Sequence, residues 1–272
     1  MSNDTSKNSQ RPPLGFADYI SSAHVKAPWG ALMATVAAVL SFVFAQLVGQ
    51  LVVPLYPHLM HWSEHRTEEW LKYAVTAQFW YVLISELLTL AILWLFWRGY
   101  VGKGVRRALG LARRLHWKDL GFAVAGIVVY YFLYLAVLAV AMSATHINTN
   151  QSQDVGFNDV NGAMNLIMTF VSLVILPPIV EEIMFRGFLF SGLSRTFGVR
   201  LGIILTSVLF AAPHLLEADA GGLLWTAGID TFVLSLVLCY LRVRTGALYA
   251  GIGVHMLKNT VAFVTLYIVH VR

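Results

Sequence analysis

Long apolar runs alternate with short polar segments along most of this sequence. Seven runs are candidates for helices that cross a bilayer, a structure that needs about 20 predominantly apolar residues. Prolines or charged residues mark most of their ends. The runs cover residues 29–53, 74–97, 120–142, 164–193, 201–216, 223–241 and 246–269. The pattern predicts an all-α, polytopic bundle of about seven transmembrane helices.

The fourth run, residues 164–193, contains two consecutive prolines, Pro177 and Pro178. Proline removes a backbone donor, and its ring clashes with the preceding helical turn. We therefore expect the fourth helix to be broken or kinked at this point.

The composition is typical of an integral membrane protein. Of the 272 residues, 58% are hydrophobic and only 12% are charged, whereas soluble domains carry about 25% charged residues. The net charge of +5 does not indicate nucleic acid, because the basic residues lie in short loops between apolar runs. We expect the chain in the lipid bilayer, with no nucleic-acid partner.

The distribution of basic residues predicts how the chain is oriented. Residues 98–118 include seven Lys and Arg, and cytoplasmic loops of membrane proteins are enriched in these residues. Residues 146–161 contain none and are predicted to face outward. The amino terminus is then cytoplasmic, where a polar tail and an interfacial segment, residues 1–28, precede the first span.

Two adjacent glutamates and an arginine lie inside the fourth run: Glu181, Glu182 and Arg186. An ionisable group at the centre of a bilayer costs about 2.5 to 3.5 kcal/mol, so these residues need partners or a function. Glu182 and Arg186 have the i, i+4 spacing of a charge pair on one helical face. Glu181 lies about 100° further round the helix and is left available as a general base. The alternative is a charge cluster that only stabilises helix packing.

Two later runs carry further polar side chains, Phe210 with His214 in the fifth and His255 with Asn259 in the seventh. A single histidine in a membrane helix is ordinarily a packing residue. At about 1.5 Å per residue, however, both histidines and Glu181 lie roughly 15 to 20 Å from the cytoplasmic ends of their helices. Their similar depth predicts one shared site.

This set of side chains supports hydrolysis by water. Glu181, assisted by His214, would take a proton from the water molecule. His255 and Asn259 would donate hydrogen bonds to the oxyanion that forms at a carbonyl. A zinc site is the alternative, with His214, His255 and Glu181 as possible ligands. The sequence leaves both possibilities open, zinc or no metal.

Other polar residues in the apolar runs are interpreted more simply. Asp230 and Glu86 are expected in the interior of the bundle, and Lys258 is given no role. The single cysteine, Cys239, excludes an intrachain disulfide and a cysteine metal cluster.

In their order, these motifs resemble those of the CPBP family, the membrane CAAX-type proteases and bacteriocin-processing, immunity or abortive-infection-like proteins. The family pattern is E-E-x-x-x-R, then F-x-x-x-H, then H-x-x-x-N or D. It is matched here by Glu181, Glu182, Arg186, Phe210, His214, His255 and Asn259. The similarity covers about residues 166–263. The resemblance implies glutamate-dependent peptide hydrolysis, with the first glutamate and first histidine activating water and the last histidine and asparagine stabilising the oxyanion.

These observations predict three regions: the tail 1–28, a three-span membrane region 29–160, and a CPBP-like protease core 161–272 with the last four spans. The expected protein is a hydrolase, an intramembrane endopeptidase of the CAAX type, metal-dependent or not. Its partners would be the bilayer and a membrane-bound peptide or protein substrate, and its location a bacterial inner membrane. A non-catalytic immunity or scaffold protein and a proton-coupled transporter are the alternatives.

Overall fold

The computed structural model describes residues 27–99, 104–145, 147, 153, 155–157, 160–218 and 222–269. The predicted tail and interfacial segment therefore lie almost entirely outside the described residues. Within the described part the secondary structure is helical, and its only β-type contact is an isolated bridge between Gln153 and Ala218.

Seven long helical stretches correspond to the seven apolar runs. They are α2 (Ala31–Val52), α5 (Val75–Arg98), α7 (Trp117–Ala144), the continuous stretch Ala163–Phe197, α11 (Val199–His214), α12 (Trp225–Thr245) and α13 (Tyr249–Tyr267). Three short helices join them, α3 (Leu55–Leu59), α4 (Glu64–Tyr73) and α6 (Val105–Ala108). The prediction of an all-α, polytopic helix bundle is confirmed.

Five helices among the described residues are long and apolar enough to span a bilayer. The sequence predicted seven. The helix α11 has 16 residues, about 24 Å at 1.5 Å per residue, which is shorter than a hydrocarbon core of about 30 Å. The helix α13 has 19 residues but is not among the five. Its His255, Lys258 and Asn259 lower its hydropathy.

The stretch Ala163–Phe197 is not interrupted at its prolines, although its helical type changes there. It consists of α8 (Ala163–Phe170), a π-helical turn (Val171–Ile175), α9 (Leu176–Glu181), a second π-helix (Glu182–Leu189) and α10 (Phe190–Phe197). Pro177 and Pro178 occupy the first positions of α9, where a missing N–H donor and a fixed φ are tolerated. The two glutamates thus lie at the junction between α9 and the second π-helix, and π-helical turns are frequent at functional sites.

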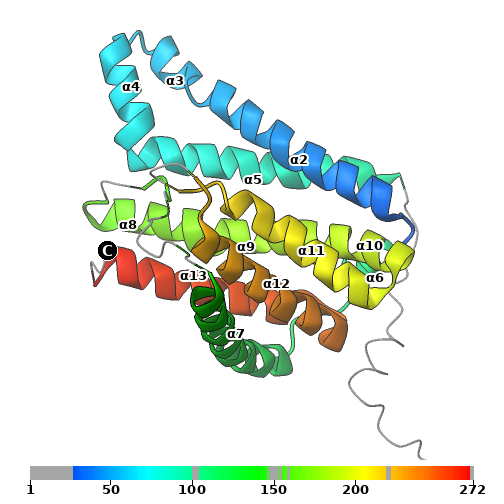
Figure 1. Ribbon diagram of the computed structural model, residues 1–272. Helices are drawn as coiled ribbons and strands as arrows, with labels where there is room; N and C mark the ends of the chain where they lie inside the picture. The colour runs from blue at the N-terminus through cyan, green and yellow to red at the C-terminus, as the bar shows by residue number, and fades with distance from the viewer. Residues whose placement is uncertain are drawn as a thin grey trace, which may run out of the picture.

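The helices form a layered bundle (Figure 1). α2 packs against α5, α11 lies between α10 and α12, and α7 crosses α12 and α13 obliquely. α2 also approaches α10 closely, because a Cβ atom added to Gly192 would lie 2.4 Å from the Cβ of Ala34. The stretch Ala163–Phe197 therefore runs through the middle of the bundle, with helices on several sides.

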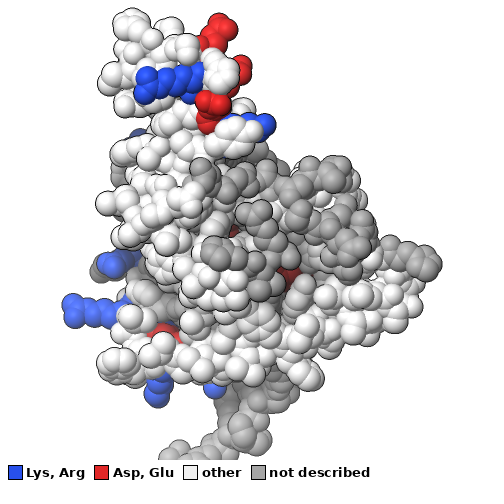
Figure 2. All heavy atoms as spheres, turned by 90° about the vertical axis from the view of Figure 1, so that its left-hand side faces the viewer, with Lys and Arg blue, Asp and Glu red and all other residues white. Residues whose placement is uncertain are grey.

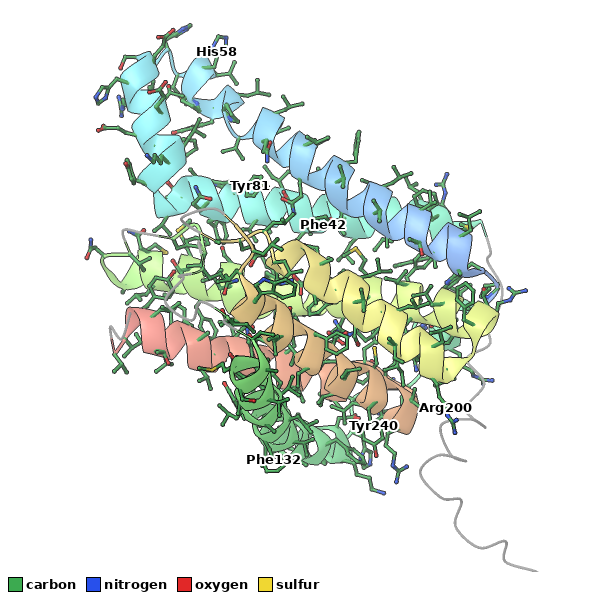
Figure 3. All side chains as sticks on the ribbon, in the orientation of Figure 1. Phe42, His58, Tyr81, Phe132, Arg200 and Tyr240 are labelled. Atoms are coloured by element: carbon green, nitrogen blue, oxygen red, sulfur yellow. The ribbon has the colours of Figure 1, made fainter. Side chains whose placement is uncertain are left out.

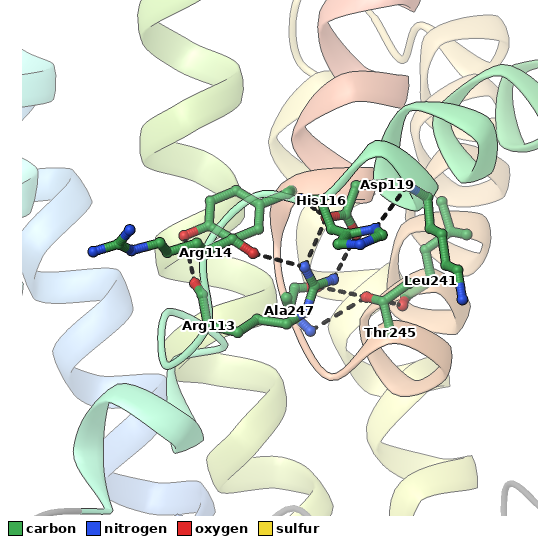
Figure 4. Close-up of polar contacts among 9 residues, drawn as sticks. Arg113, Arg114, His116, Asp119, Leu241, Thr245 and Ala247 are labelled. Carbon is green, nitrogen blue, oxygen red and sulfur yellow. Dashed lines mark hydrogen bonds and ion pairs between the residues drawn. The ribbon is translucent and has the colours of Figure 1, made fainter.

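The loop between α6 and α7 is fixed against the turn between α12 and α13 (Figure 4). Arg113 donates two hydrogen bonds, of 2.5 and 2.7 Å, to the carboxylate of Asp119. The Tyr249 hydroxyl donates to the Arg113 carbonyl at 2.9 Å, and the Leu248 N–H donates to the Gly110 carbonyl at 3.2 Å. These contacts set the first turn of α13 and, through it, the depth of His255.

Large apolar side chains cover the outside of the bundle. Leu32 on α2 is 80% exposed and Phe132 on α7 is 72% exposed, and Figure 3 shows Phe132 at the outer edge of the bundle. Figure 2 looks at the end that carries α4, where charged side chains gather over that helix and most other described atoms are uncharged. An apolar surface on helices that satisfy their own backbone hydrogen bonds suits a lipid environment. The chain is an integral membrane protein.

Candidate active site

The two adjacent glutamates have different surroundings. Glu182 is fully buried, and its Oε1 accepts a hydrogen bond from Nη1 of Arg186 at 2.8 Å. The side chain of Glu181 keeps 23% of its surface exposed and lines a cavity. The i, i+4 spacing thus closes the expected pair and leaves Glu181 facing open space.

His255 lies between the two glutamates. Its Nε2 is 3.7 Å from Oε2 of Glu181, and its Nδ1 is 3.4 Å from Oε1 of Glu182. The imidazole is almost completely buried, with 6% of its side chain exposed. Glu182 therefore has two neighbours, an arginine and a histidine, of which the sequence predicted only the arginine.

His214 is the last residue of α11 and forms its hydrogen bond within that helix. The Phe210 carbonyl accepts a hydrogen bond from Nδ1 of His214 at 2.9 Å. Because a carbonyl oxygen can only accept, Nδ1 carries the proton, and in a neutral imidazole Nε2 is then the acceptor. The tautomer that results is the one that a general base requires.

Phe210 connects the charged and imidazole side chains. Its ring centroid is 4.2 Å from Cζ of Arg186, and the ring is 5.2 Å from that of His214 and 5.9 Å from that of His255. The guanidinium over the ring face is a cation–π contact. The phenylalanine of the F-x-x-x-H motif thus holds three site residues in place.

Asn259 lies one turn beyond His255 on α13 and also lines the cavity. Its Nδ2 donates to the carbonyl of Leu173 at 2.8 Å, an oxygen of the first π-helical turn. An amide nitrogen carries two N–H donors, so this bond uses only one of them.

One cavity brings these side chains together. Its volume is about 140 Å³, and it is lined by Glu181, His214, His255 and Asn259, among others. A bound water needs about 10 to 15 Å³ of such volume and several polar partners, and the cavity provides both. The four residues that the sequence predicted to converge therefore share one cavity that is large and polar enough for water, while their catalytic roles stay predictions.

A second group of polar side chains lines this cavity, to which the sequence assigned no catalytic role. Lys258 and Asp230 both line it, and Nζ of Lys258 is 3.0 Å from Oδ2 of Asp230. The Tyr130 hydroxyl donates to the same carboxylate. The sequence does show a lysine and an aspartate in two different apolar runs. Neither has a residue of opposite charge at helical spacing in its own run, which indicates a pair between helices.

A catalytic zinc site needs three protein ligands around one ion. Among the described residues, no three His, Cys, Asp or Glu side chains are grouped as ligands of one ion. Glu181, His214 and His255 are thus not gathered around one ion position in the described structure, although Nε2 of His214 keeps the lone pair that a metal ligand needs.

Residues 163–261 match the family described as Type II CAAX prenyl endopeptidase Rce1-like. This match supports the resemblance to CPBP proteins that the motifs indicate. The matched segment begins with α8 and ends within α13, so it contains all seven motif residues and the helices that line most of the cavity.

Three similar proteins come from bacteria. The chain is 26% identical over 181 residues to Uncharacterized protein YyaK of Bacillus subtilis. This alignment covers 65% of this chain and 57% of the relative. It is 30% identical over 135 residues to Uncharacterized 24.3 kDa protein of Escherichia coli, 49% of this chain and 57% of the relative. UPF0177 protein YxdF of Lactococcus lactis is 27% identical over 93 residues, 34% of this chain and 51% of the relative. The chain therefore spans little more than half the length of these relatives, and no solved structure matches it.

Proposed function

We propose that this protein is an intramembrane endopeptidase that hydrolyses peptide bonds of membrane-associated substrates with water activated by Glu181 and His214. One observation carries the proposal. Glu182 is neutralised by Arg186 at 2.8 Å and fully buried, whereas Glu181 faces a cavity that it shares with two histidines and an asparagine. A carboxylate that is not paired with a cation, in a poorly solvated site, is a suitable general base.

The proposed reaction begins with a water molecule beside Glu181. Glu181 takes one proton, with Nε2 of His214 as the second acceptor, while the water oxygen forms a bond to the carbonyl carbon. The carbonyl oxygen becomes an oxyanion, which His255 and the second N–H of Asn259 stabilise. Glu181 then returns the proton to the amide nitrogen as the C–N bond breaks, so that an amine and a carboxylic acid form, and the acid gives its remaining proton to Nε2 of His214 and leaves as a carboxylate.

Glu182 acts in this scheme as a positioning residue. Its carboxylate oxygen lies 3.4 Å from Nδ1 of His255, so it would hold the ring as an imidazolium, whose Nε2–H is then the donor to the oxyanion. Arg186 compensates its charge in the apolar interior. The contact explains why two adjacent acids would be needed although only one faces the cavity.

The location proposed for the enzyme is a bacterial inner membrane, with the amino terminus in the cytoplasm. The bacterial relatives support the location, and the seven basic residues of 98–118 support the orientation. The partners would be the bilayer and a peptide or protein held in or at it.

The test is cleavage of a library of membrane-anchored peptides by the purified protein in liposomes, read by mass spectrometry. Glu181→Gln should lower the rate about 10²- to 10⁴-fold, the usual contribution of general acid–base catalysis. Glu64→Gln on the exposed helix α4 is the matched control and should cleave as the wild type does. A chelator should have no effect.

Two results would contradict the proposal. Cleavage retained in Glu181→Gln would remove the general base. If the wild type cleaves no peptide, and if Glu181→Gln makes the protein more stable, the non-catalytic immunity or scaffold protein would be favoured.

A further inference from the structure

We propose that the cavity opens at the extracytoplasmic end of the bundle, so that substrates reach it from the outer face of the membrane. The orientation rests on the positions and charges of the helices alone. The statement about substrates rests in addition on the proposed peptidase function.

The helices contribute to the cavity mainly from the parts nearer one end. α11 provides Phe210 and His214, at its carboxyl-terminal end. α12 provides residues from 227 to 234, in its first half, and α13 provides residues from 255 to 266, which begin at its seventh residue and reach almost to its carboxyl-terminal end. Gln153 and Val155, from the segment between α7 and α8, complete the lining. The mouth of the cavity therefore lies at the end where α11 stops and α12 starts.

The other end of the bundle is closed by the α6 segment. Ala108 and Leu109 are buried, with 3% and 2% exposed. The Ala108 carbonyl accepts hydrogen bonds of 2.7 Å from both the Ser191 hydroxyl and Nη2 of Arg242. A Cβ atom added to Gly187 would lie 3.1 Å from the Leu109 carbonyl, so the segment lies directly against the second π-helix. A substrate arriving at this end would have to displace these contacts.

Charge distinguishes the two ends of the bundle. Figure 3 shows His58 at the end of the bundle where the mouth lies and Arg200 at the opposite, closed end. The exposed basic residues of the closed end belong to the connections on that side. They are Arg98, Arg106, Arg107, Arg114, Lys118, Arg195, Arg200 and Arg244.

At the end of the bundle where the mouth lies, α4 carries two basic residues and three glutamates. Glu217 lies at the same end and accepts a hydrogen bond of 2.6 Å from Nε2 of Gln153. Figure 2 looks at this end and shows small areas of acidic atoms near its middle. Because cytoplasmic segments carry the excess of Lys and Arg, the closed end is cytoplasmic and the mouth is external. The substrates expected are peptides or proteins whose cleavage site is held at the outer leaflet.

The test is labelling of single cysteines in bacterial spheroplasts with a membrane-impermeant maleimide. The buried Cys239 is first replaced by alanine. Gln153→Cys marks the mouth, Leu216→Cys is a second marker at the same end, and Lys118→Cys marks the closed end; all three positions are exposed. The two mouth cysteines should be labelled in intact spheroplasts, and Lys118→Cys only after permeabilisation.

The opposite pattern would overturn the proposal: Lys118→Cys would then be labelled in intact spheroplasts, and Gln153→Cys and Leu216→Cys only after permeabilisation. This measurement involves no turnover, so it decides the orientation even if no peptide is cleaved. A correctly oriented protein without peptidase activity would contradict the proposed function alone. In an active preparation, a bulky maleimide on Gln153→Cys should block cleavage, and the same reagent on Lys118→Cys should leave it unchanged.

Discussion

The carboxylate of Glu182 lies 2.8 Å from Nη1 of Arg186, and neither side chain is exposed to solvent. Loss of one partner leaves an uncompensated charge in a low-dielectric interior, which costs about 3 to 5 kcal/mol for a buried pair. We predict a loss of this size in the free energy of unfolding for Arg186→Met. Glu182→Gln with Arg186→Met should lose less than the sum of the single variants, because no charge is then stranded. Chemical unfolding in detergent micelles measures the three values.

A histidine and a glutamate with the same spacing on the exposed helix α4 provide the control. Nδ1 of His65 is 3.6 Å from Oε2 of Glu69, and both side chains are more than half exposed. Exposed pairs contribute little to stability, so Glu69→Gln should unfold as the wild type does. Equal losses in Glu69→Gln and Arg186→Met would show that burial is not the cause.

The ring of Phe210 should matter for catalysis more than for folding. It lies 4.2 Å from Cζ of Arg186 and against both histidines. Leucine keeps most of the apolar volume, which usually limits the loss of stability to about 1.5 kcal/mol, but it removes the flat ring that holds the imidazoles. A misplacement of about 1 Å can lower a rate about 100-fold.

We therefore predict that Phe210→Leu lowers kcat about 10- to 100-fold with little change in KM. The control is Phe132→Leu, because Phe132 is 72% exposed on α7; this variant should keep both constants. An unchanged kcat in Phe210→Leu would show that the ring is only a packing residue.

The sequence predicts the part of the site that depends on spacing within one helix. The Glu182–Arg186 pair follows from four residues of separation, and the shared face of His255 and Asn259 follows in the same way. The order of the apolar runs predicts the seven helical stretches, although two of them are too short or too polar for the criteria of a membrane span.

Contacts between helices were not predictable, because they depend on the rotation of each helix about its own axis. The approach of His255 to Glu182, the bond from Asn259 to Leu173 and the pair of Lys258 with Asp230 join residues of different helices. The π-helices were missed because Pro177 and Pro178 indicate a disturbed helix but not which hydrogen-bond pattern replaces it.

The contact between α2 and α10 depends on a glycine. A Cβ atom on Gly192 would lie 2.4 Å from the Cβ of Ala34 and 2.9 Å from the carbonyl oxygen of Gly30. Overpacking of this kind costs about 1 to 3 kcal/mol, so Gly192→Ala should lower the thermal unfolding midpoint in micelles.

Gly121→Ala on α7 is the same chemical change in a helix where nothing lies within 4 Å of the added atom. It should leave the midpoint unchanged or raise it, because alanine is favoured over glycine in helices by about 1 kcal/mol. Equal shifts in Gly192→Ala and Gly121→Ala would contradict the close packing of α2 on α10.

The pair of Lys258 and Asp230 tests whether the polar residues that line the cavity stabilise one another. Nζ of Lys258 is 3.0 Å from Oδ2 of Asp230, and the side chains are 20% and 17% exposed. Asp230→Asn removes the counter-charge of the lysine, and Lys258→Met leaves the aspartate with the Tyr130 hydroxyl as its remaining donor. We predict that each change destabilises the protein. The loss of unfolding free energy in the double variant should be smaller than the sum of the two single losses by about 1 kcal/mol or more, within the usual range of coupling between contacting residues.

Chemical unfolding of the wild type, the two single variants and the double variant measures this coupling. Lys72→Met on α4 is the control for the loss of an exposed lysine. Additive losses would mean that the two charges are stabilised separately, by water in the cavity rather than by each other.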